Sequence, residues 1–183
     1  MVRLFAALAL PETVRTELAA LAAPLAGVRW VPPANLHLTL RFIGNATAEQ
    51  QEAFEKTLER VQVEPFILPV IGVGIFPPRG PARVLWAGLH NAHPRLFQLR
   101  QRVDEALLAV DPALDVRSFH PHITVARLDK DHGPGQLATL LQRNAAFEAP
   151  PFRVSDFHLM ASEPRPGNAP IYRLVRTFPL QPK

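Results

Sequence analysis

The sequence predicts an α+β fold with a mostly antiparallel or mixed sheet, and three observations support this. Segments with the 3.6-residue period of helices alternate with segments that have the alternation of strands. Two pairs of strands nevertheless follow each other with no helix between them, unlike a doubly wound parallel sheet. Residues 71–74 carry only two glycines inside a strand-like run, so they do not form a nucleotide-binding loop. We expect residues 1–183 to form a single domain.

The chain begins with an expected strand and helix. Residues 2–10 are largely apolar and predict a strand, because the apolar run is too brief for a signal peptide and continues directly into Pro11 and Glu12. Proline suits the first turn of a helix, so we expect a helix over 11–23 that Pro24 ends.

A second strand and helix follow. Residues 36–43 predict a strand, which Gly44 and Asn45 are expected to close. Thr47 can cap a helix that extends to about Val61. Its apolar face would be built by Ala53, Phe54, Leu58 and Val61.

The middle of the chain predicts two successive strands and the longest helix. Residues 66–76 and 82–89 are expected strands, joined by a proline-rich turn over 77–81. Residues 94–110 have apolar positions three and four apart and predict a helix, which Asp111 and Pro112 end.

The last third of the chain predicts three strands and a short helix. We expect strands at 120–128, 152–161 and 171–180, and a helix at 135–143.

Composition excludes several classes of protein. The chain has no cysteine, which excludes disulfide frameworks, thiolate nucleophiles and cysteine-ligated metals and fits a reducing compartment. No apolar run approaches the ~18 residues that span a bilayer, so we expect a cytoplasmic protein with no membrane partner. The net charge is +4, and all but three of the 20 basic residues are arginine. Arginine binds phosphate in a bidentate manner, which favours an anionic partner, although coding bias also produces arginine-rich chains.

One motif occurs twice, about half a chain apart. His37 and Thr39 lie in one predicted strand, and His122 and Thr124 lie in another, each as His-[Leu/Ile]-Thr-[Leu/Val]. Residues i and i+2 of a strand point to the same face. Each strand therefore presents one imidazole beside one hydroxyl, and the offset suggests two lobes that are built alike.

Paired histidines of this kind suit acid–base chemistry at phosphorus. Histidine titrates near neutral pH, so two of them can act as acid and base in one turnover. If they lay on either side of a cyclic phosphodiester, one would deprotonate a water molecule and the other would protonate the departing oxygen. The threonine hydroxyls could donate hydrogen bonds to the nonbridging oxygens. Attack and departure in phosphoryl transfer are roughly in line, which opposed strands can provide.

The remaining histidines do not predict a metal site. His90, His93 and His120 could be combined with His122 into a metal cluster, but no carboxylate motif accompanies them at ligand spacing. We therefore expect no metal and no other cofactor. His120 is expected behind the site as an orienting or packing residue, and His132 in a solvated loop.

Residues 35–44 and 118–127 resemble the paired motifs of the two-histidine phosphoesterases, and more narrowly of the RNA 2′,3′-cyclic phosphodiesterase family, historically called 2′-5′ RNA ligases. The segments 3–7, 83–88 and 157–172 are also similar to parts of that family, so the resemblance covers essentially the whole chain. It implies two pseudo-symmetric lobes, with helices on their outer faces, that flank a central cleft with one motif from each lobe.

The resemblance also implies roles for individual residues. His37 would be the proton donor, His122 the proton acceptor, and Thr39, Thr124 and Arg127 would bind the phosphate. Arg127 lies an odd number of residues after His122, so its side chain would point to the opposite face of a regular strand. Binding by Arg127 therefore requires that the strand ends or bulges near Ala126. Arg41 has the right parity with His37 and is a further candidate phosphate ligand, although no family motif requires it.

The expected function is hydrolysis of a terminal RNA 2′,3′-cyclic phosphate to a 2′-phosphomonoester, with reversible 2′-5′ ligation as a secondary activity. RNA ends such as those of tRNA halves are the expected partners, and the protein is expected to be a monomer with no obligate protein partner. Two alternatives stay open at this point. One is a noncatalytic, basic RNA-binding module, and the other is a phosphodiesterase that acts on small cyclic nucleotides or 2′-5′ oligoadenylate.

Overall fold

The computed structural model describes residues 1–89, 92–115, 118–130 and 133–181, and it confirms the α+β class. The described strands are β1 (Val2–Ala9), β2 (Val28–Trp30), β3 (His37–Ala46), β4 (Phe66–Ile71), β5 (Val73–Phe76), β6 (Val84–Gly88), β7 (His122–Leu128), β8 (Glu148–Val154), β9 (Asp156–Arg165) and β10 (Asn168–Pro179). The helices are α1 (Glu12–Ala19), the 3₁₀ turn η1 (Pro33–Asn35), α2 (Ala48–Leu58), α3 (Pro94–Leu108) and α4 (Pro134–Arg143).

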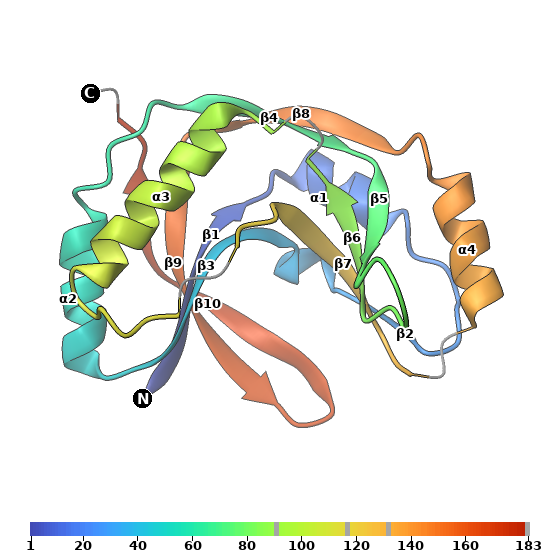
Figure 1. The fold of residues 1–183 in the computed structure, drawn as a ribbon, viewed down its shortest axis with the longest axis horizontal. Coiled ribbons are helices and arrows are strands. Elements are labelled where there is room, and N and C mark those ends of the chain that lie inside the picture. The colour runs from blue at the N-terminus through green and yellow to red at the C-terminus, as the bar shows by residue number, and fades with distance from the viewer. Residues whose placement is uncertain (90–91, 116–117, 131–132, 182–183) are drawn as a thin grey trace.

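Most strands belong to one curved sheet that arches through the molecule (Figure 1). Its strand order is β10-β9-β1-β3-β7-β6-β5, with β2 paired to β7, and every pair in it is antiparallel. The two halves of this sheet meet where β3 pairs with β7 at Leu38 and Ile123, both of which are fully buried. A separate two-stranded sheet is formed by β4 and β8.

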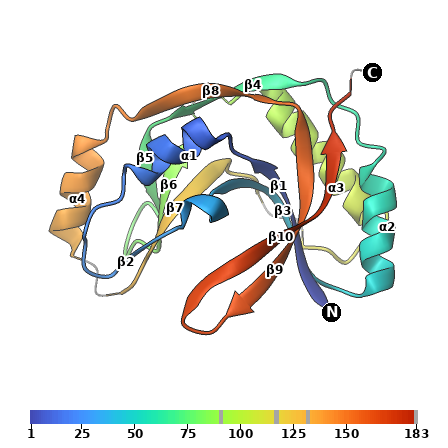
Figure 2. The same ribbon diagram turned by 180° about the vertical axis from the view of Figure 1, so that it is seen from behind.

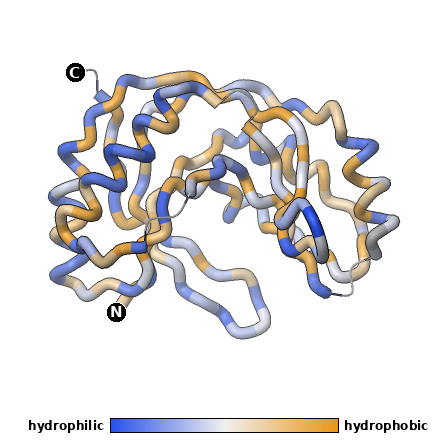
Figure 3. The backbone as a smooth tube through the Cα atoms, in the orientation of Figure 1, coloured by the Kyte–Doolittle hydropathy of each residue, from blue (hydrophilic) through white to orange (hydrophobic). Residues whose placement is uncertain are grey.

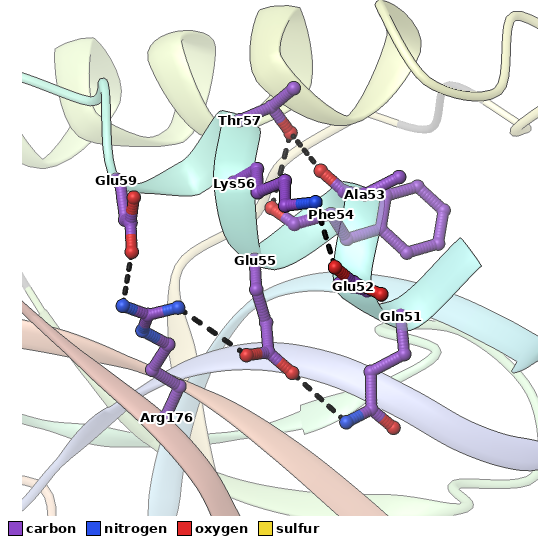
Figure 4. A network of polar contacts seen from close by, with 9 residues as sticks. All are labelled: Gln51, Glu52, Ala53, Phe54, Glu55, Lys56, Thr57, Glu59 and Arg176. Atoms are coloured by element: carbon purple, nitrogen blue, oxygen red, sulfur yellow. Dashed lines mark hydrogen bonds and ion pairs between the residues drawn. The ribbon is translucent and has the colours of Figure 1, made fainter. Parts of the chain in front are cut away.

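Helices α2, α3 and α4 lie at the two ends of the molecule, whereas α1 lies beneath β4 and β8 and contacts β8 (Figures 1 and 2). α2 and α3 contact each other and β3, and α4 lies at the opposite end of the molecule. The predicted apolar stripe of α3 is buried, since Leu96, Leu99, Val103 and Leu107 have no exposed area. α2 is also held to β10 by ion pairs of Arg176 with Glu55 and Glu59 (Figure 4).

Helix ends follow local capping chemistry. Thr47 forms a capping box with Gln50, in which each side chain bonds the backbone N–H of the other residue, so the predicted start of α2 is confirmed. α1 is shorter than predicted, because the amides of Leu21 and Ala22, which follow it, bond carbonyls only three residues back, at 3.3 Å and 3.1 Å. Helices end at or before the residue preceding a proline, here Pro24.

Two segments predicted as single strands are each two strands. The run 66–76 is divided at Gly72, whose φ of +79° is a left-handed conformation that favours glycine. As a result, β4 belongs to the two-stranded sheet and β5 belongs to the large sheet. The run 152–161 is likewise divided at Ser155 between β8 and β9, again in different sheets. β3 is longer than predicted and continues past Gly44 to Ala46.

The β9–β10 hairpin projects from the body beneath the arch (Figure 1). Its tip has few strongly hydrophobic residues (Figure 3). The short elements β2 and η1 were not predicted, because three-residue segments carry too little periodicity to be recognised. Among the described residues, no helix combines the length and apolar character needed to cross a membrane.

Candidate active site

The histidine motifs come together at the junction between the two halves of the sheet. Since Leu38 pairs with Ile123 in an antiparallel ladder, His37 lies across from Thr124, and Thr39 lies across from His122. All four side chains line one cleft of about 430 Å³. The two imidazoles occupy diagonal positions, for which Cβ separations of about 7–8 Å are typical. This is a spacing that one phosphate group can bridge.

Both imidazoles are oriented in the same way. The Nδ1 of His37 lies 2.7 Å from the carbonyl oxygen of Asn35, and the Nδ1 of His122 lies 2.7 Å from the carbonyl oxygen of His120. A carbonyl can only accept, so each Nδ1 carries the proton and each Nε2 is left to exchange protons in the cleft. In His37 this Nε2 lies 3.0 Å from the hydroxyl of Thr39. The expected orienting role of His120 is therefore performed by its backbone carbonyl.

Aromatic rings hold each imidazole in place. Phe5 and Tyr172 lie 5.0 Å and 5.1 Å from His37, measured between ring centroids, and Tyr172 meets the imidazole edge to face. On the other side of the cleft, Phe76 packs edge to face on His122 at 5.0 Å. These contacts restrict imidazole rotation, so the rings are presented to a ligand in fixed orientations.

The electrostatics of His37 differ from those of an exposed histidine. Burial lowers the pKa of His37, and the positive charges of Arg127 and His122 lower it further, whereas the hydrogen bond to the Asn35 carbonyl opposes them. The ligand-free protein therefore favours neutral His37. A bound anion would act in the opposite direction and favour the imidazolium.

A bulge brings Arg127 into the cleft. Trp86 pairs with Thr124, but its neighbour Leu85 pairs with Ala126, so Val125 is an extra residue in β7. The bulge reverses the alternation of side chains and puts Arg127 on the face of the histidine, which resolves the parity problem. The amide of Val31 donates a 2.9 Å hydrogen bond to the Val125 carbonyl and fixes this bulge.

A matching bulge removes Arg41 from the cleft, and the expectation that Arg41 binds phosphate is corrected. Ala7 pairs with Thr39 and Ala6 pairs with Arg41, so Leu40 is the extra residue. Arg41 thereby turns to the helix side, where it is 3% exposed and lies 3.3 Å from Asp104 of α3. Arg41 is not among the residues that line the cleft.

The formal charges in the described lining of the cleft are all positive. It contains no Asp or Glu, and its arginines are Arg3, Arg29, Arg127 and Arg165. Strand patterns in the sequence did not identify Arg3, Arg29, Arg165 or Tyr172 as cleft residues. Strand alternation could have identified Arg3, which shares a parity with Phe5, whereas Arg29 depends on the unpredicted strand β2.

The other described histidines have structural partners. His93 caps α3 by accepting a 3.1 Å hydrogen bond from the amide of Arg95. His158 lies between the carboxylate of Asp156 at 3.1 Å and the hydroxyl of Thr177 at 3.0 Å. His90 and His132 lie outside the described residues. Within the described part of the chain, no group of three or more His, Asp or Glu is arranged to hold a metal ion.

Known proteins share both the sequence pattern and the fold. The family model for LigT-like phosphoesterases matches residues 8–86 and 89–171. The RNA 2′,3′-cyclic phosphodiesterase of Archaeoglobus fulgidus is 31% identical over 96% of this chain and 99% of its own. That of Thermus thermophilus is 35% identical over 98% of this chain and 90% of its own.

Solved structures agree with the sequence comparisons. A crystal structure from Thermus thermophilus superposes with a TM-score of 0.80 at 29% identity, covering 99% of both chains. Escherichia coli LigT complexed with 3′-AMP superposes with a TM-score of 0.77 at 28% identity, covering 98% of both chains. The paired histidine strands and these matches, which extend over nearly all of the sequence, show that the chain belongs to the LigT-like phosphoesterase family.

Proposed function

We propose that this protein hydrolyses the 2′,3′-cyclic phosphate at the end of an RNA chain to a 2′-phosphomonoester. The observation that carries the proposal is the convergence of two imidazole–hydroxyl pairs, one from each half of the sheet, in a cleft whose described lining holds four arginines and no carboxylate. The names of the relatives support the same substrate class. Since one sheet runs through both halves, we propose that residues 1–183 act as a single bilobal domain.

The proposed reaction uses the two histidines in complementary protonation states. His122 accepts a proton from water through Nε2, and the water oxygen forms a bond to phosphorus. The bond between phosphorus and the ribose 3′ oxygen breaks, and His37 donates its proton to that oxygen. Atoms and charge balance, and the 2′ oxygen keeps the phosphate. No metal or other cofactor is needed for these steps.

The remaining cleft residues would stabilise charge. Thr39 and Thr124 line the cleft and would donate hydrogen bonds to the nonbridging oxygens, and Arg127 would add a positive charge beside them. The same substrate charge offsets the effects that lower the pKa of His37, so His37 becomes the acid only when the anion is bound. Binding of inorganic phosphate should therefore raise the pKa of His37 in an NMR titration.

Reversal of the reaction would join a cyclic phosphate to a 5′-hydroxyl end. The same acid and base serve both directions, but water is so concentrated that hydrolysis should dominate. We propose ligation as a secondary activity, and fragments such as tRNA halves as one source of substrate.

The decisive assay uses an oligonucleotide that ends in a 2′,3′-cyclic phosphate, with EDTA present and the regiochemistry of the product determined. The expected result is a 2′-phosphate product with the parent protein and greatly reduced turnover after His37→Ala or His122→Ala, with RNA affinity little changed. A noncatalytic RNA-binding module would show no turnover in the parent either. A requirement for added metal would overturn the proposed mechanism.

A second candidate function concerns smaller substrates. Escherichia coli LigT has been solved with 3′-AMP, and the cleft of about 430 Å³ in this chain is large enough for one nucleotide. A phosphodiesterase acting on small cyclic nucleotides or 2′-5′ oligoadenylate would be faster on those compounds than on the oligonucleotide. A direct comparison of kcat/KM across the three substrates distinguishes the two functions.

A further inference from the structure

Two arginines lie directly opposite each other in the sheet. Arg29 of β2 pairs in register with Arg127 of β7, and both side chains are exposed and line the cleft. Like charges at directly opposed positions of antiparallel strands destabilise the pair. Because no carboxylate lines the described cleft, nothing among its lining residues offsets this repulsion. The two guanidiniums can together offset more negative charge than the single charge of one phosphodiester.

A carboxylate outside the cleft lining holds Arg29. Its Nη2 and Nε lie 2.8 Å and 3.2 Å from the same oxygen of Asp129, which follows β7. The two side chains are 70% and 49% exposed. Ion pairs at such exposure contribute little to stability and are weakened by competing ions. A phosphate in the cleft can therefore take the place of Asp129 at modest cost.

We propose that Arg29 binds the phosphodiester that precedes the terminal nucleotide, which makes it a second phosphate subsite that selects RNA chains over mononucleotides. This inference rests on the proposed function. Arg127 carries a positive charge near His37, and Arg29 lies directly across from Arg127 on β2, a position for which Cβ atoms are typically about 4.5–5.5 Å apart. Two guanidiniums at this spacing can bind successive phosphates, each through a planar pair of donors.

A phosphate-binding role of Arg29 has to be distinguished from a structural role. The amide of Asp129 also bonds the carbonyl of Gly27 at 2.8 Å, so Arg29 and Asp129 together close the β2–β7 pair. The amide of Val31 in turn fixes the bulge that aims Arg127. A purely structural Arg29 would therefore affect all substrates alike, whereas a phosphate subsite affects only substrates that carry the second phosphate.

The experiment compares three substrates with the same terminal base. They are a mononucleoside 2′,3′-cyclic phosphate, a dinucleotide with one charged internal phosphodiester, and the same dinucleotide with an uncharged methylphosphonate linkage. Arg29→Ala should lower the ratio of kcat/KM for the charged dinucleotide to kcat/KM for the mononucleotide by about tenfold. With the methylphosphonate dinucleotide the corresponding ratio should be unaffected by the substitution. For longer RNA, Arg29→Ala should make the plot of log affinity against log salt concentration less steep, by about 0.7 in the magnitude of its slope.

The matched control is Arg173→Ala. Arg173 pairs with Glu163 at exposures of 67% and 44%, close to those of Arg29 and Asp129, but it does not line the cleft. Arg173→Ala should leave all substrate ratios unchanged. A reduction by Arg29→Ala that is equal for all three substrates, or no reduction at all, would overturn the subsite. If the parent protein cleaves neither the mononucleotide nor the dinucleotide, the proposed function itself is wrong.

Discussion

Strands β3 and β7 share a backbone pattern but differ in the side chains that they carry after the threonine. In both, a histidine, a buried residue and a threonine are followed by a bulge and by a reversal of side-chain alternation. The residue four positions after the histidine is Arg41 in β3 and Ala126 in β7, and both are buried. The residue five positions after it is Phe42 in β3 and Arg127 in β7, and both line the cleft.

The two halves therefore repeat the geometry of the histidine–threonine pair but place different residues after it. β7 contributes Arg127 to the cleft lining, whereas the arginine of β3, Arg41, is buried beside Asp104 of α3. The bulges are also fixed differently. The carbonyl of Leu40 accepts a hydrogen bond from the buried Arg100 of α3, whereas the carbonyl of Val125 accepts one from the backbone of β2. Symmetry in backbone therefore coexists with asymmetry in charge.

The largest expected effect comes from removing either histidine. His37→Ala and His122→Ala should each lower kcat by about 10²–10⁴-fold, since each removes one proton transfer. The parent should have a bell-shaped pH–rate profile with apparent pKa values that belong to the pair, and each variant should lose one limb. Thermal melting checks that the variants are folded. Retention of both limbs in either variant would contradict the complementary roles.

Arg127→Gln tests the asymmetry in charge. We expect kcat/KM to decrease by about 100-fold, because a donor to the charge that develops on the phosphate is lost. Because the charge of Arg127 lowers the pKa of His37, the substitution should also raise that pKa toward 6.5, as an NMR titration would show. An unchanged His37 titration would mean that Arg127 does not act on the acid.

Arg100→Met tests the support of the β3 bulge. Arg100 is largely buried, bonds the Leu40 carbonyl and lies 2.6 Å from Asp104. Its replacement leaves a buried carbonyl without this donor, so the free energy of unfolding should decrease by about 2–3 kcal/mol in chemical denaturation. The exposed Arg102→Met on the same helix serves as the control and should cost less than about 0.5 kcal/mol.

The smallest expected effect comes from making the two strands more alike. Phe42→Arg places a positive charge at the β3 position that corresponds to Arg127, close to Phe5 and thus to His37. The pKa of His37 should become slightly lower still, because the added positive charge is exposed to solvent and screened. A raised pKa would show that Phe42 acts on His37 through burial.

Much of the site follows from strand periodicity in the sequence. Alternation alone places His37 with Thr39 and His122 with Thr124, and it directs Leu38 and Ile123 into the core. Capping and proline signals likewise locate α2, α3 and α4 to within a few residues. These features are local, because each depends only on residues that are a few positions apart in the sequence.

The tertiary structure alone decided which of two arginines, Arg41 or Arg127, lines the cleft. Parity in the sequence favours Arg41 and disfavours Arg127, yet one extra residue in each strand reverses both outcomes. A bulge exists only relative to a partner strand, so Leu40 and Val125 cannot be recognised as extra residues within their own segments. The same holds for Arg29, whose opposition to Arg127 arises only when β2 pairs with β7. Side-chain alternation is a property of the single chain, whereas register belongs to the assembled sheet.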